Sequence, residues 1–282
     1  MNLPSPLLHA LAALFAVLLA VALDRAADRR GLLPPGFSQP LRRSAAGVLI
    51  ALFFYGTIFS PIASLGESDP ADAVGTPIPL LFTVHAVMLA VVWMWHGLGY
   101  RALDFRAPEG RFTVQVGLAS RRLGEDVALG LGGGIAGWAG LMVVMASALG
   151  VTFLLGGEDQ LPTQAPEVIA WLAGLPLLVR LALSCSAGLV EEIFFRGFLQ
   201  PRIGILASTS LFVLAHASYE QPFMLIGLTY LSLLFAYLVR WRQNIWPAVV
   251  AHAVFDFWQL AVVIPSVLKF VGPAGGGAAP GP

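Results

Sequence analysis

The chain has 282 residues, of which 57% are hydrophobic and only 11% charged, and its formal net charge is zero. Soluble domains carry about 25% charged residues, so this composition indicates a protein with several membrane-spanning segments. The chain has no basic run, which argues against nucleic-acid binding. Its one cysteine, Cys185, excludes an internal disulfide framework and a cysteine-rich zinc module, and we expect it to be a small buried apolar residue.

Long apolar stretches follow one another along the chain, most of them close to the about 17–25 residues that cross a bilayer. They cover residues 7–23, 45–65, 78–100, 127–155, 168–200, 204–218, 223–239 and 245–271, and the sixth and seventh are short. The sequence therefore predicts an all-α fold, a polytopic transmembrane helical bundle of about eight spans. Residues 272–282 consist only of Gly, Ala and Pro, and we expect this low-complexity tail to be disordered.

Arginine is confined to alternate connecting segments. The arginine-rich segments are 24–44, 101–126 and the short turn that holds Arg240 and Arg242, whereas 66–77, 156–167 and 219–222 contain neither Lys nor Arg. By the positive-inside rule, the arginine-rich segments face the cytoplasm and both termini are extracytoplasmic. Since nothing in the sequence is typical of a eukaryotic protein, we expect a multi-pass protein of the bacterial inner (cytoplasmic) membrane.

The glycines of the fourth span allow two interpretations. Gly132, Gly134 and Gly137 match the G-x-G-x-x-G pattern of dinucleotide-binding loops, but they lie inside an apolar span and follow no predicted strand. Gly130, Gly133, Gly134 and Gly137 instead have the small-xxx-small spacing that lets two membrane helices approach closely. We therefore predict a close helix contact here and no nucleotide site.

Several ionisable residues fall inside predicted spans, where each costs about 2.5–3.5 kcal/mol to insert. They are Arg180, Glu191, Glu192, Arg196, His216, His252 and Asp256. Such residues either form a functional site or pair with one another to fasten helices. His9, His85 and His96 have no carboxylate at helical spacing, so we expect them to be packing or interfacial residues.

Helix geometry assigns different roles to the two adjacent glutamates. Glu192 and Arg196 are spaced i, i+4 and share a helix face, so they are expected to form an ion pair. Glu191 lies about 140° around the helix from Arg196 and cannot easily share that partner. A carboxylate without a cation in an apolar site is a candidate general base. Glu192 and Arg196 are thus predicted to be structural, and Glu191 to be chemical.

The depth of these residues points to one shared site. Measured from the cytoplasmic turns at about 1.5 Å per residue, Glu191, His216 and the His252/Asp256 face all lie roughly 12–20 Å into the membrane. They come from three of the predicted spans, 168–200, 204–218 and 245–271. Unrelated structural charges would rarely reach the same level, so we interpret them as one site.

Three segments resemble, in order and spacing, the motifs of a known family. "EEIFFR" (191–196), "FVLAH" (212–216) and "HAVFD" (252–256) are similar to the EExxxR, FxxxH and Hxxx(N/D) motifs of the CPBP family. These are the CAAX-processing, Rce1-like and bacteriocin-processing intramembrane endopeptidases, also called ABI proteins. The resemblance covers about residues 165–262. It divides the chain into 1–160 without a recognised motif, a CPBP-like catalytic core at 165–271, and the tail 272–282.

The resemblance implies a glutamic-type intramembrane protease with its catalytic cavity among the C-terminal helices. Carried over, Glu191 and His216 activate water, and His252 with Asp256 stabilises the oxyanion. Glu192, Arg196 and Phe212 match the supporting motif positions. Well-studied eukaryotic members have Asn where this chain has Asp256, and an ionised Asp accepts hydrogen bonds but donates none. Asp256 is therefore protonated, orients His252, or serves another purpose.

The expected substrate is a membrane-associated protein or peptide precursor in the lipid bilayer, and no cofactor is expected. The alternative is a zinc-dependent protease with the same residues, because two histidines and a carboxylate are a plausible zinc set; the chain lacks H-E-x-x-H. A non-catalytic scaffold or immunity protein would keep the charges as helix contacts. A proton-coupled transporter would use them as a relay, but the inverted repeats of many transporters are not evident.

Overall fold

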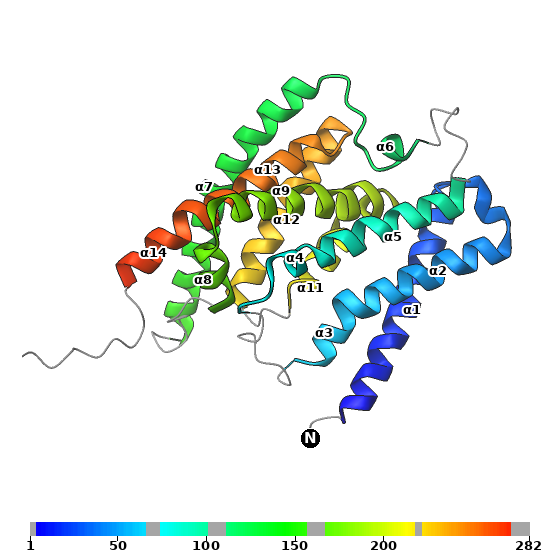
Figure 1. The fold of residues 1–282 in the computed structure, drawn as a ribbon, viewed down its shortest axis with the longest axis horizontal. Helices are drawn as coiled ribbons and strands as arrows, with labels where there is room; N and C mark the ends of the chain where they lie inside the picture. Colours follow the sequence, from blue (N-terminus) through cyan, green and yellow to red (C-terminus); the bar gives the residue numbers. More distant parts are fainter. Residues whose placement is uncertain (1–3, 66–73, 101–110, 157–166, 218–221, 272–282) are drawn as a thin grey trace, which may run out of the picture.

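The computed structural model describes residues 4–65, 74–100, 111–156, 167–217 and 222–271, and every regular element in these ranges is helical (Figure 1). The predicted all-α fold is therefore confirmed for this part of the chain. The tail 272–282 and most of the acidic connecting segments lie outside the described residues.

The longer helices are α1 (Ser5–Arg29), α2 (Pro40–Phe54), α5 (Thr83–Tyr100), α7 (Leu123–Gly156), α9 (Leu177–Glu191), α12 (Pro222–Arg242) and α13 (Trp246–Trp258). Short helices are η1 (Pro35–Ser38), α3 (Ser60–Ala63), α4 (Ile78–Leu81), α6 (Phe112–Gln115), α8 (Glu167–Gly174), α10 (Gln200–Ile203), α11 (Ile205–Leu214) and α14 (Ile264–Val271). Three π-helical stretches, η2 (Tyr55–Phe59), η6 (Glu192–Leu199) and η8 (Gln259–Val263), continue longer helices. Such widened turns are rare and often mark functional sites.

The number of membrane-spanning helices differs from the predicted eight. In the described residues, five helical stretches are long and apolar enough to cross a membrane: Ser5–Arg29, Pro40–Ala63, Leu123–Gly156, Phe223–Arg242 and Trp246–Lys269. A sixth results if Val168–Gly174 and Leu177–Ile203 count as one broken span. The structure thus supports a multi-pass membrane protein, and the count of eight is not confirmed.

Two predicted spans depart from a straight crossing for clear physical reasons. The stretch 168–200 is bent by 119° between α8 and α9, where Pro176 is extended (ψ 141°) and supplies no backbone N–H to continue the helix. Arg180 donates hydrogen bonds to the carbonyls of Ala173 and Leu260, both at 2.8 Å, and so fastens this bend to η8. The stretch 204–218 forms α11, whose 10 residues reach only about 15 Å, half of a hydrocarbon core.

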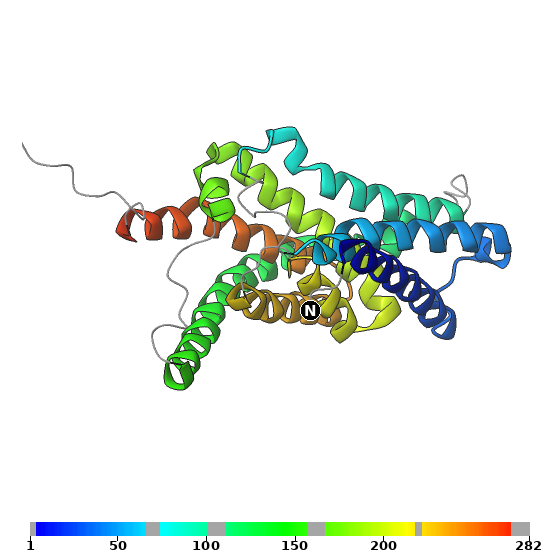
Figure 2. The same cartoon turned by 90° about the horizontal axis from the view of Figure 1, so that it is seen from below.

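The glycines of α7 make the close contact predicted for them. A Cβ atom at Gly130 would lie 2.8 Å from the carbonyl oxygen of Pro247, and one at Gly134 would lie 3.0 Å from that of Ala251. Both partners belong to α13, so α7 and α13 pack with their backbones close together. α13 in turn packs on α9, which crosses the middle of the molecule with α5 on its other side (Figures 1 and 2).

Cys185 lies on the exposed side of α9, so the expectation that it is buried was wrong. In a membrane helix the lipid-facing side is also apolar, and hydrophobicity alone does not separate it from the protein core.

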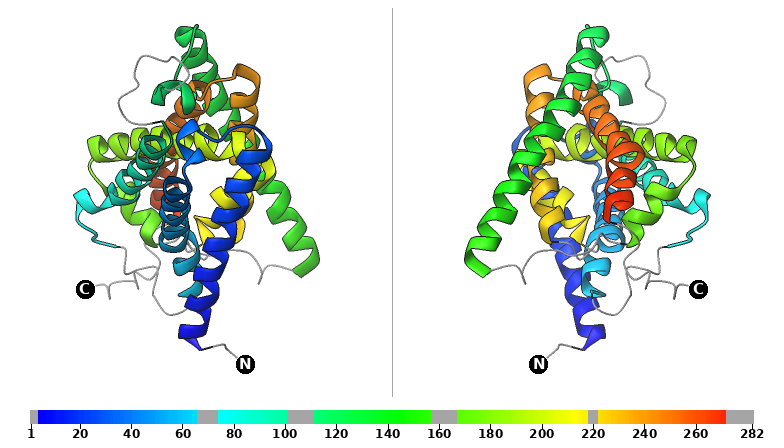
Figure 3. Two further views of the ribbon diagram at one scale, coloured as in Figure 1. Left: turned by 90° about the vertical axis from the view of Figure 1, so that its right-hand side faces the viewer. Right: turned by 90° about the vertical axis from the view of Figure 1, so that its left-hand side faces the viewer.

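The two ends of the bundle have different chemistry. The start of α1 and the end of α7 point toward one end of the molecule, while α6 and the α12–α13 turn lie at the other (Figures 1 and 3). The second end carries arginines tied into the fold: Arg242 lies 2.6 Å from the buried Asp126, and Arg30 donates to the carbonyl of Pro201 at 2.8 Å. If the spans alternate in direction, every second connection lies at the same end, as these arginine-containing connections do. Which end faces the cytoplasm stays a prediction.

Reporter fusions test that orientation. A fusion at Arg111 is expected to give a cytoplasmic signal, whereas fusions at Asp72 and after the last residue are expected to give extracytoplasmic signals, because arginine-rich segments stay inside. A cytoplasmic signal from the Asp72 or C-terminal fusion contradicts the topology.

Candidate functional site

The two adjacent glutamates lie at the junction of α9 and η6, where α9 packs closely on α13. Glu191 is the last residue of α9 and Glu192 the first of the π-helical turn. One turn earlier, a Cβ atom on Gly188 would lie 2.8 Å from both the amide nitrogen of Ala253 and the carbonyl oxygen of Val249. Only glycine permits this approach, which brings the glutamates next to His252 on α13.

Glu192 is completely buried and holds two partners. Its Oε1 atom lies 3.0 Å from Arg196 Nη1 and 2.9 Å from His252 Nδ1. The predicted i, i+4 ion pair is therefore confirmed, and the same carboxylate also fixes the histidine of the third motif. Glu192 thus links α9 and η6 to α13.

Arg196 and Phe212 form the centre of the buried polar cluster. The Arg196 guanidinium lies 4.5 Å above the Phe212 ring centroid and within 3.3 Å of the carbonyl and hydroxyl oxygens of Ser232. The Phe212 ring also lies 4.8 Å from the His216 ring and 6.1 Å from the His252 ring. Phe212 therefore contacts the structural arginine and the two motif histidines at once.

The second ring nitrogen of His252 faces Asp256. His252 Nε2 lies 3.4 Å from Asp256 Oδ2, and the Phe235 ring stacks on the imidazole at 5.1 Å. The His252 side chain is 7% exposed and that of Asp256 30% exposed. With a carboxylate at each nitrogen and a ring on its face, His252 has a fixed orientation. This geometry favours the interpretation that Asp256 orients His252.

Glu191 faces a histidine on another helix. Its Oε1 atom lies 3.5 Å from His85 Nε2 of α5, and its Oε2 atom is buried without a hydrogen-bond partner among the described residues. His85 Nδ1 in turn lies 2.9 Å from the Ser186 hydroxyl of α9. The expectation that His85 is a packing or interfacial residue was therefore wrong.

His216 follows α11 and completes the surroundings of Glu191. Its Nδ1 atom lies 2.8 Å from the Phe212 carbonyl oxygen, which fixes the ring relative to α11. His85, His216 and His252 are all close enough to Glu191 to interact electrostatically with its carboxylate. The structure thus gathers Glu191 with histidines from α5, the end of α11 and α13.

The zinc alternative requires these side chains to converge on one point. Among the described residues, no group of three or more His, Cys, Asp and Glu side chains is placed so that it could hold a metal ion. Glu191, His216 and His252 therefore do not form a ligand set in this conformation.

The comparison with protein families agrees with this location. Residues 173–258 match the family model described as "Type II CAAX prenyl endopeptidase Rce1-like". The predicted family resemblance is confirmed. The Rce1-like segment runs from the end of α8 to the end of α13 and contains all three motifs, whereas His85 lies outside it. No curated protein and no solved structure matches the chain.

Proposed function

We propose that the protein is an intramembrane endopeptidase of the CAAX-protease type, which hydrolyses a peptide bond in a membrane-associated protein or peptide precursor. The observation that carries the proposal is the position of Glu191. It is a carboxylate inside an apolar bundle, its neighbour Glu192 pairs with the nearby arginine, and histidines from α5, α13 and the turn after α11 lie around it. The Rce1-like segment contains this arrangement except for His85.

The chemistry needs an activated water and a proton donor for the leaving amine. Glu191, together with His216, takes a proton from water while the water oxygen attacks the carbonyl carbon of the scissile bond. The resulting tetrahedral oxyanion then collapses, the C–N bond breaks, and the same proton passes to the leaving nitrogen. The products are a new carboxyl terminus and a free amine. Water must reach Glu191 through a cavity, because lipid supplies none, and that cavity stays a prediction.

His252 is the proposed donor to the oxyanion. Glu192 keeps the Nδ1 atom, and the oxyanion takes over the Nε2–H group, which faces Asp256 at the longer distance of 3.4 Å before the substrate reacts. Since Asp256 accepts from the imidazole, an amide oxygen at the same position can do the same. Asp256→Asn is therefore expected to retain activity within about tenfold, while His252→Ala loses about 10²–10³-fold, as expected for one oxyanion donor. Steady-state cleavage rates of the two purified variants check this. An Asp256→Asn variant as inactive as His252→Ala shows that the carboxylate itself takes part in the reaction.

His85 is a positioning residue for Glu191 in this proposal. Through Nε2 it holds the carboxylate, and through Nδ1 the Ser186 hydroxyl fixes its ring. His85→Gln is expected to lower kcat about 10²-fold, since a small misplacement of the base is enough for such a loss, and to alter the pH dependence of kcat.

A matched control lies on the same helix. His96 packs on Tyr100 and Phe112, away from Glu191, so His96→Gln should leave both kcat and its pH profile unchanged. If His85→Gln lowers activity with an unchanged pH profile, or only together with thermal stability, its role is purely structural. Ser186→Ala should have a smaller effect than His85→Gln; complete inactivation would identify Ser186 as the nucleophile instead.

Substrate trapping tests the function itself. Glu191→Gln, purified from cells in detergent, is expected to retain an uncleaved membrane-associated polypeptide that the wild-type protein then cuts. Normal function of the Glu191→Gln variant in cells supports a non-catalytic scaffold and contradicts the proposal.

A further inference from the structure

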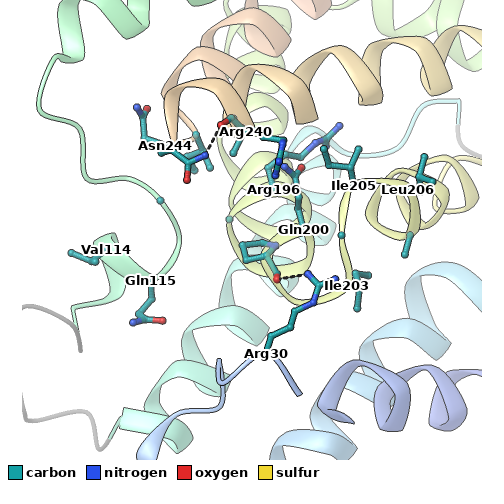
Figure 4. Close-up of a pocket in the computed structure, with 18 residues that line it drawn as sticks. Arg30, Val114, Gln115, Arg196, Gln200, Ile203, Ile205, Leu206, Arg240 and Asn244 are labelled. Carbon is teal, nitrogen blue, oxygen red and sulfur yellow. Dashed lines mark hydrogen bonds between the residues drawn. The ribbon is translucent and has the colours of Figure 1, made fainter. Parts of the chain in front are cut away.

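A large cavity lies at the arginine-rich end of the bundle, and Glu191 is not among its lining residues. It is open on one side, has a volume of about 840 Å³ and is lined by residues of η6, α10, α11, α6, the end of α1 and the α12–α13 turn (Figure 4). Its walls include Arg196 but not Glu191, His216 or His252. A volume of this size is typical of a ligand site, so its lining decides what it can bind.

The charged residues of this cavity are all positive. Arg30, Arg196 and Arg240 line it, and no Asp or Glu is among its described lining residues. Arg30 approaches from one side and Arg196 and Arg240 from the other (Figure 4). Glu192 neutralises the charge of Arg196. Within the described ranges, neither Arg30 nor Arg240 forms an ion pair. The cavity therefore has an unbalanced positive charge that suits an anion.

A buried acceptor adds a second requirement on the ligand. Gln200, 9% exposed, lies between the arginines and donates through Nε2 to the Ala236 carbonyl at 3.1 Å. Its Oε1 atom is buried and has no hydrogen-bond partner in the described part of the chain. A buried acceptor without a donor is costly, so a ligand with a hydroxyl beside its negative group would satisfy both features.

The remaining lining combines the amide side chains of Gln115, Gln243 and Asn244 with an apolar side. Ile203, Ile205 and Leu206 line one side, and Leu206 is 76% exposed on the outer surface of α11. Trp241, at the end of α12, is 69% exposed, and exposed aromatic residues at helix ends are typical of the membrane–water interface. The cavity thus has an arginine-rich polar part and an apolar edge. Trp241 indicates that both lie near the level of the lipid headgroups.

From these features we infer that the cavity binds the headgroup of an anionic, hydroxyl-bearing phospholipid of the phosphatidylglycerol type. The phosphate lies between Arg30 and Arg240, since guanidinium groups bind phosphate oxygens in a matching geometry. A headgroup hydroxyl donates to Gln200 Oε1, and an acyl chain leaves along Ile205 and Leu206. Basic pockets between membrane helices bind lipid headgroups in this way. Because the inner end of the cavity is Arg196, the bound lipid also supports η6, which holds Glu192.

Lipid binding to the full-length protein in detergent tests the site without any turnover, so its result is independent of the proposed protease activity. Native mass spectrometry would measure binding of phosphatidylglycerol to wild-type protein and to the Arg30→Gln/Arg240→Gln double variant. Binding to the double variant is expected to be about 10- to 30-fold weaker, as two cations near the surface predict. The single Arg240→Gln variant gives a smaller loss if the double variant folds poorly.

Two exposed arginines at the same end provide the matched control. Arg29 and Arg121 do not line the cavity, so Arg29→Gln/Arg121→Gln removes the same charge and is expected to bind almost as the wild type does. An equal loss in both double variants contradicts the site, because general surface charge then explains the binding.

Two further binding comparisons test the hydroxyl contact and the requirement for acyl chains. Wild-type protein is expected to prefer phosphatidylglycerol to phosphatidylmethanol, which has the same charge but no headgroup hydroxyl, and Gln200→Met is expected to lose that preference. Glycerol phosphate without acyl chains is expected to bind at least tenfold more weakly. Equal binding of free glycerol phosphate, or no preference between the two lipids, overturns the assignment.

Discussion

Replacing Glu191 with Gln is expected to abolish peptide cleavage while the protein stays folded. Gln keeps the size of the side chain but cannot accept a proton from water, and a general base contributes about 10²–10⁴-fold to rate. Glu191 makes one contact at 3.5 Å to His85 and leaves Oε2 without a partner among the described residues. Since little native bonding depends on its charge, thermal unfolding in detergent should change only slightly.

The partnership with His216 is tested by combining the two substitutions. Because residues that act as one unit are not additive, Glu191→Gln/His216→Ala should be no less active than Glu191→Gln alone. Cleavage rates of the two single variants and the double variant, measured with one peptide, give the answer. Losses that multiply in the double variant contradict a shared water.

Replacing Glu192 with Ala is expected to unfold the protein far more readily than any change at Glu191. Glu192 is fully buried between Arg196 and His252, and the substitution leaves the 1% exposed Arg196 without its counter-charge. Removing one member of a buried ion pair costs about 3–5 kcal/mol. Thermal unfolding in detergent should show a large decrease in Tm for Glu192→Ala and for Arg196→Ala.

A second ion pair of the chain serves as the control. Arg122 and Glu125 lie 3.3 Å apart at spacing i, i+3, and both are mostly exposed. Exposed pairs contribute little to stability, so Arg122→Ala should leave Tm nearly unchanged. If Glu191→Gln lowers Tm more than Glu192→Ala does, the division between a structural and a chemical glutamate is wrong.

The sequence was a good guide wherever a single helix determines the contact. The spacing of Glu192 and Arg196 predicted their ion pair, and the glycines of α7 predicted a close helix contact, here with α13. Both follow from the fixed 3.6-residue period of a helix, which needs no knowledge of the remaining fold.

Contacts between distant helices were not predictable in this way. His85 has no carboxylate at helical spacing on α5, and its partner Glu191 follows more than a hundred residues later on α9. Only the packing of α5 on α9 brings them together. Hydrophobicity likewise predicted one continuous stretch at 168–200. It carries no information on backbone direction, and the chain bends by 119° at Pro176 inside this apolar segment.

The involvement of His85 also gives the N-terminal half a role in the site. The Rce1-like segment starts at residue 173, but α5 supplies His85, whose Nε2 atom lies 3.5 Å from the Glu191 carboxylate. A fragment restricted to the Rce1-like segment would lack this contact.

The central claim is that Glu191 acts on water without a metal, and cleavage by exhaustively chelated protein tests it most directly. Purified wild-type protein would be treated with a strong chelator, its metal content assayed, and its cleavage of a membrane peptide compared with that of Glu191→Gln. The account predicts full wild-type activity at substoichiometric metal and none in the Glu191→Gln variant. Activity that disappears with the metal and returns with one equivalent of zinc would contradict it.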